Sequence, residues 1–231
     1  MIITIDGPVA SGKSTVSRML AQKLGCYYLC SGLLYRALAY LLIHHCGYTE
    51  KTIANPRMDD VERCLDADHF VYHYDKYSQE FICFDEEDIT PYLKDKFMDN
   101  ITSLVSVNEH VRSAVTVIQR NIAVHHSIVT DGRDVGSVVF PQASFKFFVT
   151  ASAEVRAQRW RKDQEKYGNY VSGDQARALI TDRDNRDKNR TVAPLIIPHD
   201  AIVIDTTQLS ALQAVELMMK HINGCEVGDV F

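Results

Sequence analysis

The chain has 231 residues, 46% of them hydrophobic, and a formal net charge of −5. This length and apolar content exclude a disordered chain and suit a globular protein with a substantial core. The negative charge argues against a general binder of nucleic acid or of a membrane surface, since both kinds of binding depend on a basic protein field.

The cysteine pattern and the N-terminal residues bear on the cellular compartment. The six cysteines form no C-x-x-C pair and no zinc-type cluster with histidine, which favours reduced side chains that behave as small hydrophobes. The chain starts on an apolar run instead of a charged leader, and no apolar stretch reaches the ~18 to 20 residues that cross a bilayer. We therefore expect a cytoplasmic monomer that binds neither membrane nor nucleic acid.

The N-terminal stretch changes from a strand pattern to a turn and then to a helix pattern. Residues 1–6 form a short β-prone run, and apolar residues recur at helical spacing from Thr15 to Leu24. Between them, Gly7-Pro-Val-Ala-Ser-Gly-Lys-Ser14 meets every fixed position of the P-loop signature. Small residues let backbone N–H groups converge on a polyphosphate, and the following helix directs the positive end of its dipole at the anion. The alternative is a glycine-rich turn without a ligand.

This motif predicts a site for a nucleoside triphosphate. Lys13 is expected to reach the β- and γ-phosphates, and the Ser14 hydroxyl is expected to ligate Mg²⁺, with Asp131 as a second ligand through water. The loop residues predicted to bind ATP are Gly7, Pro8, Val9, Ala10, Ser11, Gly12, Lys13, Ser14 and Thr15.

The next segment combines a strand and a helix. Gly25 is placed to end the first helix, and residues 26–30 form a second β-prone run. Ser31 is predicted to cap a helix that ends at Gly47. Arg36 opposes the dipole of this helix, so it is either solvated or holds an anion.

A change of periodicity follows. After a short helix at 58–66, two aromatic and β-branched runs within 69–84 predict a hairpin. The consecutive acids at 85–88 lack the alternating spacing of a calcium loop and predict a solvated turn. Thr90-Pro91 is predicted to start a helix.

Two helical patterns then lead to a third strand. They cover 92–107 and 108–123, with Asn108 as the N-cap between them. The strand at 127–131 runs directly into Gly-Arg-Asp-Val-Gly136. Charged residues at the carboxyl end of a strand lie where open α/β sheets bind ligands. A loop with an internal Arg–Asp pair is the alternative.

Two basic helices follow, at 153–166 and 174–189. Arg183, Arg186 and Arg190 recur at steps of three and four residues, and we expect them to line one face together with Asp187. Such a stripe of guanidinium groups suits phosphoryl transfer, which needs charge neutralisation. Pairing between i and i+4 on a solvated helix is the alternative.

The order of elements predicts the fold class. Strands alternating with helices indicate an α/β fold with a five-stranded parallel sheet and helices on both faces. The hairpin lies outside this pattern, in a β-rich insertion at about 62–91. No repeat or low-complexity linker interrupts a single domain at 1–223, which a tail at 224–231 follows. The predicted strands are 1–6, 26–30, 127–131, 144–149 and 201–205, and a last helix covers 210–223.

Several segments together carry a resemblance to one family. They are Ile-Asp-Gly-Pro before the P-loop, Ser31-Gly, Tyr35-Arg36, Asp131-Gly-Arg-Asp134 with Gly136 and Val139-Phe-Pro141, and Arg183-Asp-Asn-Arg-Asp-Lys-Asn-Arg190 with Val192-Ala-Pro194. From Ile3 to about His221 the chain resembles the bacterial cytidylate kinases, in the nucleoside monophosphate kinase group. Cys30 stands where that family often has an acid.

The resemblance implies transfer of the γ-phosphoryl group of ATP, with Mg²⁺, to CMP or dCMP. It also implies a monophosphate-binding region at about 31–107, including the β-rich insertion, and a helical lid at about 152–172 over the ATP. Two alternatives stay open: a kinase for another small acceptor, such as UMP or a metabolite hydroxyl, and a nucleotide-gated switch.

The resemblance also implies roles for individual residues. Ser103, Arg112 and Asp134 match positions that recognise cytosine, and Arg183 and Asp187 match positions that contact the sugar. The acceptor phosphate is expected on Arg36, Arg133 and Arg190, and the ATP under Arg156 and Arg159. The full CMP set is Ser31, Tyr35, Arg36, Ser103, Arg112, Arg133, Asp134, Arg183, Asp187 and Arg190, and the catalytic set is Lys13, Arg133, Arg183, Asp187 and Arg190.

Overall fold

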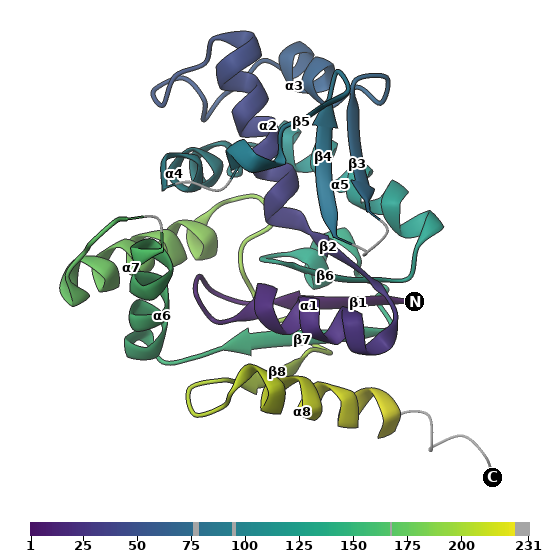
Figure 1. Ribbon diagram of the computed structural model, residues 1–231, viewed down its shortest axis with the longest axis vertical. Coiled ribbons are helices and arrows are strands. Elements are labelled where there is room, and N and C mark those ends of the chain that lie inside the picture. The colour runs from purple at the N-terminus through teal and green to yellow at the C-terminus, as the bar shows by residue number, and fades with distance from the viewer. Residues whose placement is uncertain (76–78, 94–95, 167, 225–231) are drawn as a thin grey trace. The chain divides into compact units, whose positions relative to one another are not determined.

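The computed structural model describes residues 1–75, 79–93, 96–166 and 168–224 (Figure 1). The chain forms two compact units. Unit 1 contains Met1–Tyr28, His126–Asn189 and the chain from Ala193 onward, and unit 2 contains Leu29–His125 and Arg190–Val192. The tip of the predicted hairpin (76–78), Tyr167 of the expected lid and residues 225–231 of the expected tail lie outside the described residues.

Unit 1 is built on a five-stranded parallel sheet with strand order β2-β6-β1-β7-β8. β1 lies at the centre, and Ile5 is in register with Asp131 of β6 and Phe147 of β7. The central strands are apolar because parallel strands are normally covered on both faces, and Ile3, Ile5 and Phe147 are buried. The strands are β1 (Ile2–Asp6), β2 (Tyr27–Cys30), β6 (Ile128–Gly132), β7 (Phe145–Thr150) and β8 (Ile202–Asp205).

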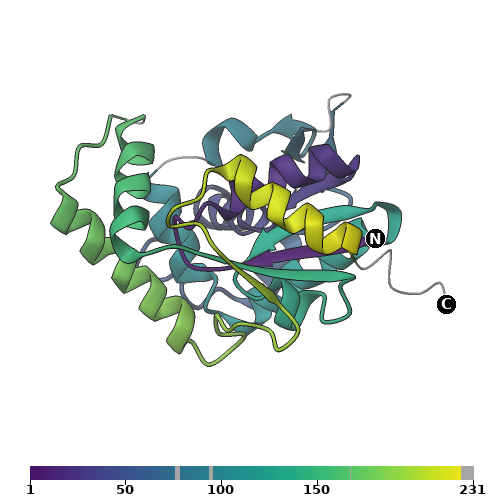
Figure 2. The same ribbon diagram turned by 90° about the horizontal axis from the view of Figure 1, so that it is seen from below.

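The helices of unit 1 are α1 (Lys13–Leu24), α6 (Ala153–Glu165), α7 (Gly173–Asn189) and α8 (Ala211–Gly224), with one turn of π-helix at Val135–Val139. α1 ends at Gly25, whose left-handed backbone (φ 65°) caps the helix as predicted. α8 packs on α1. α6 and α7 lie side by side in both views (Figure 1 and Figure 2).

Unit 2 consists of α2 (Ser31–Cys46), α3 (Met58–Cys64), β3 (Phe70–Tyr74), β4 (Glu80–Phe84), β5 (Glu87–Asp88), a 3-10 turn (Thr90–Leu93), α4 (Lys96–Val105) and α5 (Glu109–His125). The three strands form an antiparallel sheet in the order β3-β4-β5. Phe70 faces Phe84 across the hairpin, which confirms the β-rich insertion. α4 and α3 both pack on α2, whose Leu34, Leu38 and Leu41 are fully buried.

The predicted class, the five-stranded parallel sheet and the small β-rich insertion are therefore confirmed. Each predicted strand of the main sheet agrees with the observed one to within one residue. The parts of the chain that the structure describes include no helix with both the length and the apolar content needed to span a bilayer.

Two local predictions are wrong. Ser31 is the first helical residue of α2 and not its cap; Cys30 occupies the cap position because β2 runs straight into the helix. Thr90 starts a 3-10 turn that ends at Leu93, before α4. Its hydroxyl accepts the N–H of Ile82 at 2.8 Å, and this bond ties the turn to β4.

Candidate active site

The P-loop, residues 7–14, joins β1 to α1 and has an unusual backbone. A Cβ on Gly7 (φ +151°) would lie 2.0 Å from the carbonyl oxygen of Val149, so only glycine fits. Gly12 (φ 93°) and Ala10 (φ 55°) also lie in the left-handed region. This region costs little for glycine but is strained for alanine. Such a turn lets successive N–H groups converge on an anion.

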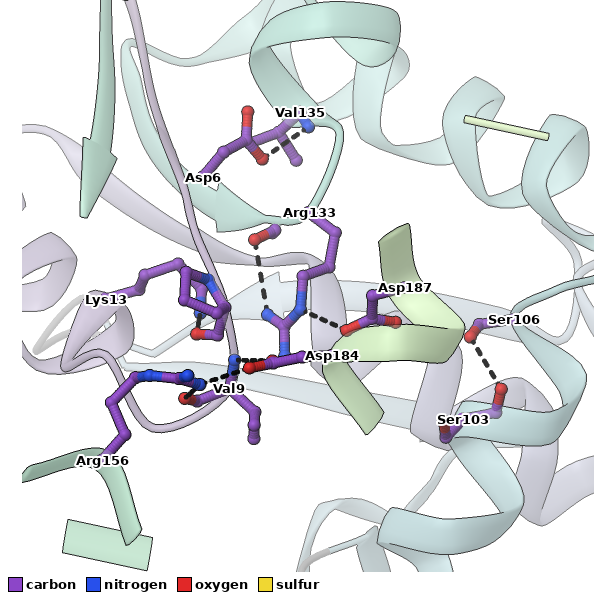
Figure 3. A network of polar contacts seen from close by, with 12 residues as sticks. Asp6, Val9, Lys13, Ser103, Ser106, Arg133, Val135, Arg156, Asp184 and Asp187 are labelled. Carbon is purple, nitrogen blue, oxygen red and sulfur yellow. Dashed lines mark hydrogen bonds and ion pairs between the residues drawn. The ribbon is translucent and has the colours of Figure 1, made fainter. Parts of the chain in front are cut away.

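Lys13 is buried at the start of α1 and its ammonium group donates to the carbonyl oxygen of Pro8 at 2.7 Å (Figure 3). Burial lowers the pKa of Lys13 well below its usual value, the nearby Arg133 lowers it further, and Asp131 and Asp187 oppose this shift. An added phosphate would favour the charged amine. Lys13 is thus placed in a dry site where an anionic ligand gains most from it.

Two side chains with oxygen atoms that could bind a metal ion lie close together: Asp131 near the end of β6 and Ser14 at the start of α1. The Ser14 hydroxyl donates to Oδ2 of Asp131 at 2.7 Å, and the hydroxyl of Tyr28 donates to Oδ1 at 2.6 Å. Mg²⁺ prefers oxygen ligands and keeps several waters. The pairing of a hydroxyl with a carboxylate fits a hydrated Mg²⁺ held directly by Ser14 and through water by Asp131.

The loop after β6 is held by Asp6, the residue immediately before the P-loop. The Asp6 carboxylate accepts the N–H of Val135 at 2.9 Å (Figure 3) and that of Gly136 at 2.8 Å. Burial raises the pKa of Asp6 to about 6, although the two hydrogen bonds oppose the shift. A Cβ on Gly136 would lie 2.7 Å from Oγ1 of Thr4, so the close approach also requires glycine. These contacts fix the backbone two and three residues after Arg133, at the start of the π-helical turn.

Arg133 pairs with an acid on α7. Its Nε donates to Oδ2 of Asp187 at 2.7 Å, and its Nη1 donates to the carbonyl oxygen of Gly132 at 3.4 Å. Burial by itself lowers the pKa of Arg133, but the Asp187 carboxylate, together with the charges of Asp184 and Asp131, raises the pKa above its usual value. The two predicted site residues therefore lie in direct contact, and Arg133 is held in the charged form.

The two arginines expected to cover ATP contact the P-loop backbone within unit 1. Arg159 donates to the carbonyl oxygen of Ser11 at 3.2 Å and to both oxygens of Thr206, Oγ1 at 2.9 Å and the carbonyl at 2.8 Å. Arg156 donates to the carbonyl oxygen of Val9 at 3.2 Å. α6 thus presents two cations to the loop that is predicted to bind phosphate.

Three of the predicted CMP residues lie together in unit 2. Arg112 donates to the carbonyl oxygen of Ser106 at 2.8 Å, and its guanidinium lies 5.4 Å from the centre of the Tyr35 ring. The Ser106 hydroxyl donates to the carbonyl oxygen of Ser103 at 3.3 Å. The Ser103 hydroxyl is buried and has no hydrogen-bond partner among the described residues. This cluster offers charged and neutral hydrogen-bonding groups at one place.

Two further contacts shape the same unit. Asn108 accepts the N–H groups of His110 at 3.0 Å and Val111 at 3.2 Å, which confirms that it caps α5, the helix that carries Arg112. Arg36 of α2 forms an ion pair with Asp99 of α4. Asp99 therefore fixes the position of Arg36 within unit 2.

Arg190 corrects the predicted stripe on α7. The helix ends at Asn189, and the chain then leaves the helical path, with Ala193 in a left-handed conformation (φ 50°). Arg190 belongs to the segment 190–192 that is grouped with unit 2. Only Arg183, Arg186 and Asp187 of the predicted stripe are helical.

The structure thus distributes the predicted site residues over both units. Lys13, Ser14, Asp131, Arg133 and Asp187 are linked within unit 1, and the charge of Arg183 also acts on Lys13. Asp134, whose charge acts on Asp6, belongs to unit 1 as well. The remaining CMP residues, Ser31, Tyr35, Arg36, Ser103, Arg112 and Arg190, belong to unit 2.

Sequence reasoning missed five residues that hold predicted site residues or the P-loop in place. They are Asp6, Tyr28, Asp99, Asp184 and Thr206. A signal existed for Asp184, which stands three residues before Asp187 and therefore on the same side of α7. For the others, the partner is too far away in the sequence for spacing to indicate it.

Comparisons with known proteins show the family of the chain. A family model described as cytidylate kinase matches residues 3–224. A cytidylate kinase of Shewanella piezotolerans is 37% identical over 228 residues, with 96% of this chain and 94% of the relative covered. One from a Marinomonas species is 39% identical over 221 residues, with coverage of 94% and 93%. An uncharacterised protein from Eubacterium ventriosum shares the fold, with a TM-score of 0.50, 14% identity and coverage of 96% and 98%. The chain therefore belongs to the cytidylate kinase family.

Proposed function

We propose that the protein transfers the γ-phosphoryl group of ATP to CMP and dCMP and so forms the corresponding diphosphates. Membership of the cytidylate kinase family supports this activity. The observation that carries it in the structure is the buried Lys13 at the end of a P-loop, beside Arg133, Asp131 and Asp187. Phosphoryl transfer needs such an arrangement, because the protein contributes mainly position and charge.

ATP is assigned to the P-loop of unit 1. The loop N–H groups and Lys13 would hold the β- and γ-phosphates, and Arg156 and Arg159 belong to a region, about 152–172, that we propose closes over the nucleotide. Mg²⁺, on Ser14 and through water on Asp131, would neutralise charge on the transferring group. Exclusion of water at the same time prevents hydrolysis of ATP.

The acceptor is assigned to the residues that the resemblance to the family indicates. Arg36, Arg133 and Arg190 are proposed to bind the phosphate of CMP, and Arg183 and Asp187 its sugar. Because the acceptor is already a phosphate anion at neutral pH, no separate general base is required. The proposed arginines, with Lys13, would offset the repulsion between the negatively charged γ-phosphate of ATP and the phosphate of CMP.

Ser103, Arg112 and Asp134 are proposed to read the cytosine ring. Cytosine presents an exocyclic donor together with acceptors, which a carboxylate, a guanidinium and a hydroxyl match. The buried Ser103 hydroxyl supports this assignment. A buried hydroxyl without a hydrogen-bond partner is unfavourable, and a hydrogen bond to the cytosine ring would remove this penalty. A site built in this way rejects uracil, since its own polar groups would lose their partners.

The setting in the cell follows from the substrates. We propose that the protein acts in the cytoplasm, where ATP and CMP are present, and that it acts as a monomer. Sedimentation velocity of the purified protein tests the second point.

The activity is tested by measuring release of ADP from ATP with and without CMP, dCMP, UMP or AMP. We expect CMP and dCMP each to accelerate ADP release by orders of magnitude, and UMP and AMP to act far less. Preference for UMP or for a metabolite hydroxyl would assign the chain to another acceptor. ADP release that no acceptor changes would instead indicate a nucleotide-gated switch.

A further inference from the structure

Val9 of the P-loop has both of its main-chain polar groups held by a pair of charged side chains (Figure 3). Oδ1 of Asp184, on α7, accepts the Val9 N–H at 3.1 Å. Nη1 of Arg156, on α6, donates to the Val9 carbonyl oxygen at 3.2 Å and forms an ion pair with the other oxygen of Asp184. One acid and one arginine therefore enclose a single residue of the phosphate-binding loop.

We propose that Asp184 is a positioning residue for ATP: it holds the P-loop in its phosphate-binding shape and orients Arg156. The inference rests on the proposed function and extends it to a residue that need not touch either nucleotide.

The ion pair between Asp184 and Arg156 is almost fully buried, so each charge needs the other as its partner. The Asp184 side chain is only 7% exposed and that of Arg156 only 12%. A buried charge without its partner is strongly unfavourable, so neither side chain can leave alone. Arg156 is further fixed by a hydrogen bond from its Nε to the carbonyl oxygen of Ala151 at 3.2 Å, at the end of β7.

An apolar contact reinforces the polar one. The side chain of Val9 is buried in a cluster with Ala157 of α6 and with Ala176 and Ile180 of α7. Backbone and side chain of one loop residue are thus both held by the α6–α7 pair. We infer that the loop and these helices behave as one mechanical unit at Val9.

The residue after Val9 shows why the loop needs this support. Ala10 is in the left-handed conformation (φ 55°), which is strained for a residue with a Cβ. Such a conformation persists only where the surroundings over-determine it. The Asp184 bond to the Val9 N–H fixes the peptide group immediately before the strained residue, so its loss would let the loop relax away from its anion-binding shape.

α7 carries two buried acids, and each of them pairs with an arginine from another part of unit 1. Asp184 and Asp187 are both buried and lie three residues apart, hence on the same side of the helix. Asp187 holds Arg133, a proposed CMP residue, and Asp184 holds Arg156, a proposed ATP residue. The charge of Asp184 also raises the pKa of Arg133, but it does so less than that of Asp187, which is hydrogen-bonded to Arg133. A change at Asp184 should therefore act mainly on ATP and only weakly on CMP.

The test compares Asp184→Asn with Asp182→Asn, a matched control on the same helix whose acid is exposed. Asparagine keeps an oxygen for the Val9 N–H but removes the ion pair with Arg156. We expect Asp184→Asn to raise the KM for ATP by about tenfold or more while the KM for CMP stays within about twofold. Asp182→Asn should change neither constant. Arg156→Met should lose less activity in the Asp184→Asn background than in the wild type, because the two residues act as a pair.

Unchanged KM for ATP, or equal increases for ATP and CMP, would overturn the role of Asp184. If Asp184→Asn does not fold, Asp184→Glu replaces it: this variant keeps the charge but moves the carboxylate away from the Val9 N–H, and it must show the same selective effect. Calorimetric titration with a non-hydrolysable ATP analogue gives a readout that needs no acceptor. A wild-type protein that binds this analogue but phosphorylates no CMP would refute the proposed function alone. A normal affinity of Asp184→Asn for the analogue would refute the positioning role alone.

Discussion

Gly7 shows how a single side chain determines whether the phosphate loop forms. We predict that Gly7→Ala loses ATP binding and several kcal/mol of the free energy of unfolding, because its Cβ would lie 2.0 Å from the backbone oxygen of Val149. Gly25→Ala is the matched control. Gly25 also has a positive φ (65°) but has no atom within 4 Å of the added Cβ, so it should cost only about 1 kcal/mol.

Urea denaturation and titration with an ATP analogue measure the two effects separately. Equal destabilisation in Gly7→Ala and Gly25→Ala would show that backbone strain alone, without the steric clash, determines the cost.

Asp6 should make the stability of the protein depend on pH in an unusual direction. Its pKa in the folded state is about 6, against an ordinary value of 3.8, because of burial. The folded state therefore binds more protons than the unfolded state between these values. The stabilisation from this proton is complete below pH ~4 and is lost as the pH rises through 6, by about 3 kcal/mol in all.

Asp6→Asn removes this titration. The free energy of unfolding of the wild type, minus that of Asp6→Asn, should therefore fall by about 3 kcal/mol between pH 3 and pH 8. Urea unfolding at several pH values measures the difference, in which most other groups cancel. The charges of Asp134 and Lys13 also act on Asp6, in opposite directions. A difference that rises with pH would contradict the prediction.

The site residues that sequence predicted are those whose chemical type follows from a local requirement. A P-loop needs glycine where the backbone turns and a lysine at a fixed distance, so the motif is readable within eight residues. The bond from Tyr28 to Asp131 spans 103 positions and that from Val9 to Asp184 spans 175. The first pair depends on which strands are neighbours in the sheet, and the second depends on where α7 packs. Local spacing contains no information about either.

Helix α5 offers a test of capping at the level of an element. Asn108 accepts two N–H groups of the first turn, and we predict that Asn108→Ala lowers the free energy of unfolding by about 1 kcal/mol. Asn121→Ala is the control, because Asn121 is exposed within the same helix, and alanine there should be neutral or slightly stabilising.

Urea unfolding of both variants measures this difference. Since the cap sets the start of the helix that carries Arg112, Asn108→Ala should also raise the KM for CMP more than Asn121→Ala does. Equal stability of the two variants would show that tertiary packing, and not the cap, determines where α5 begins.

Among the elements, the strands were predicted best. Buried parallel strands are continuous apolar runs bounded by glycine or charged residues, and this pattern is visible without any partner. The errors at Ser31 and Thr90 arose where an element is joined to a neighbour: β2 continues into α2, and Thr90 is hydrogen-bonded to β4. Local cap and start signals do not reveal such connections.

At the scale of the whole molecule, each of the two units is assembled from separate segments of the chain, and the order of elements along the sequence does not reveal this division. The chain leaves unit 1 after Tyr28, returns at His126, and visits unit 2 again only for Arg190–Val192. No composition change or linker marks these points. The resemblance predicted which residues matter, but only the structure shows which of them share a unit.

We predict that binding of the two substrates can be impaired separately, because the proposed ATP residues all lie in unit 1 and Ser103 lies in unit 2. A ligand at 100 times its Kd stabilises the folded state by about 2.7 kcal/mol, or roughly 5 to 10 °C in melting temperature for a chain of this size. Lys13→Ala, in unit 1, should abolish the shift caused by an ATP analogue and keep most of that caused by CMP. Ser103→Ala, in unit 2, should do the reverse.

Lys23→Ala is the control for Lys13→Ala, because Lys23 is an exposed lysine on the same helix, and it should keep both shifts. Differential scanning fluorimetry at several ligand concentrations measures all of them, since the shift must grow with the logarithm of ligand concentration once the site is filled. Loss of both shifts in Lys13→Ala, with the apo melting temperature unchanged, would mean that the two substrates share this lysine. The P-loop would then have to be assigned to both substrates instead of to ATP alone.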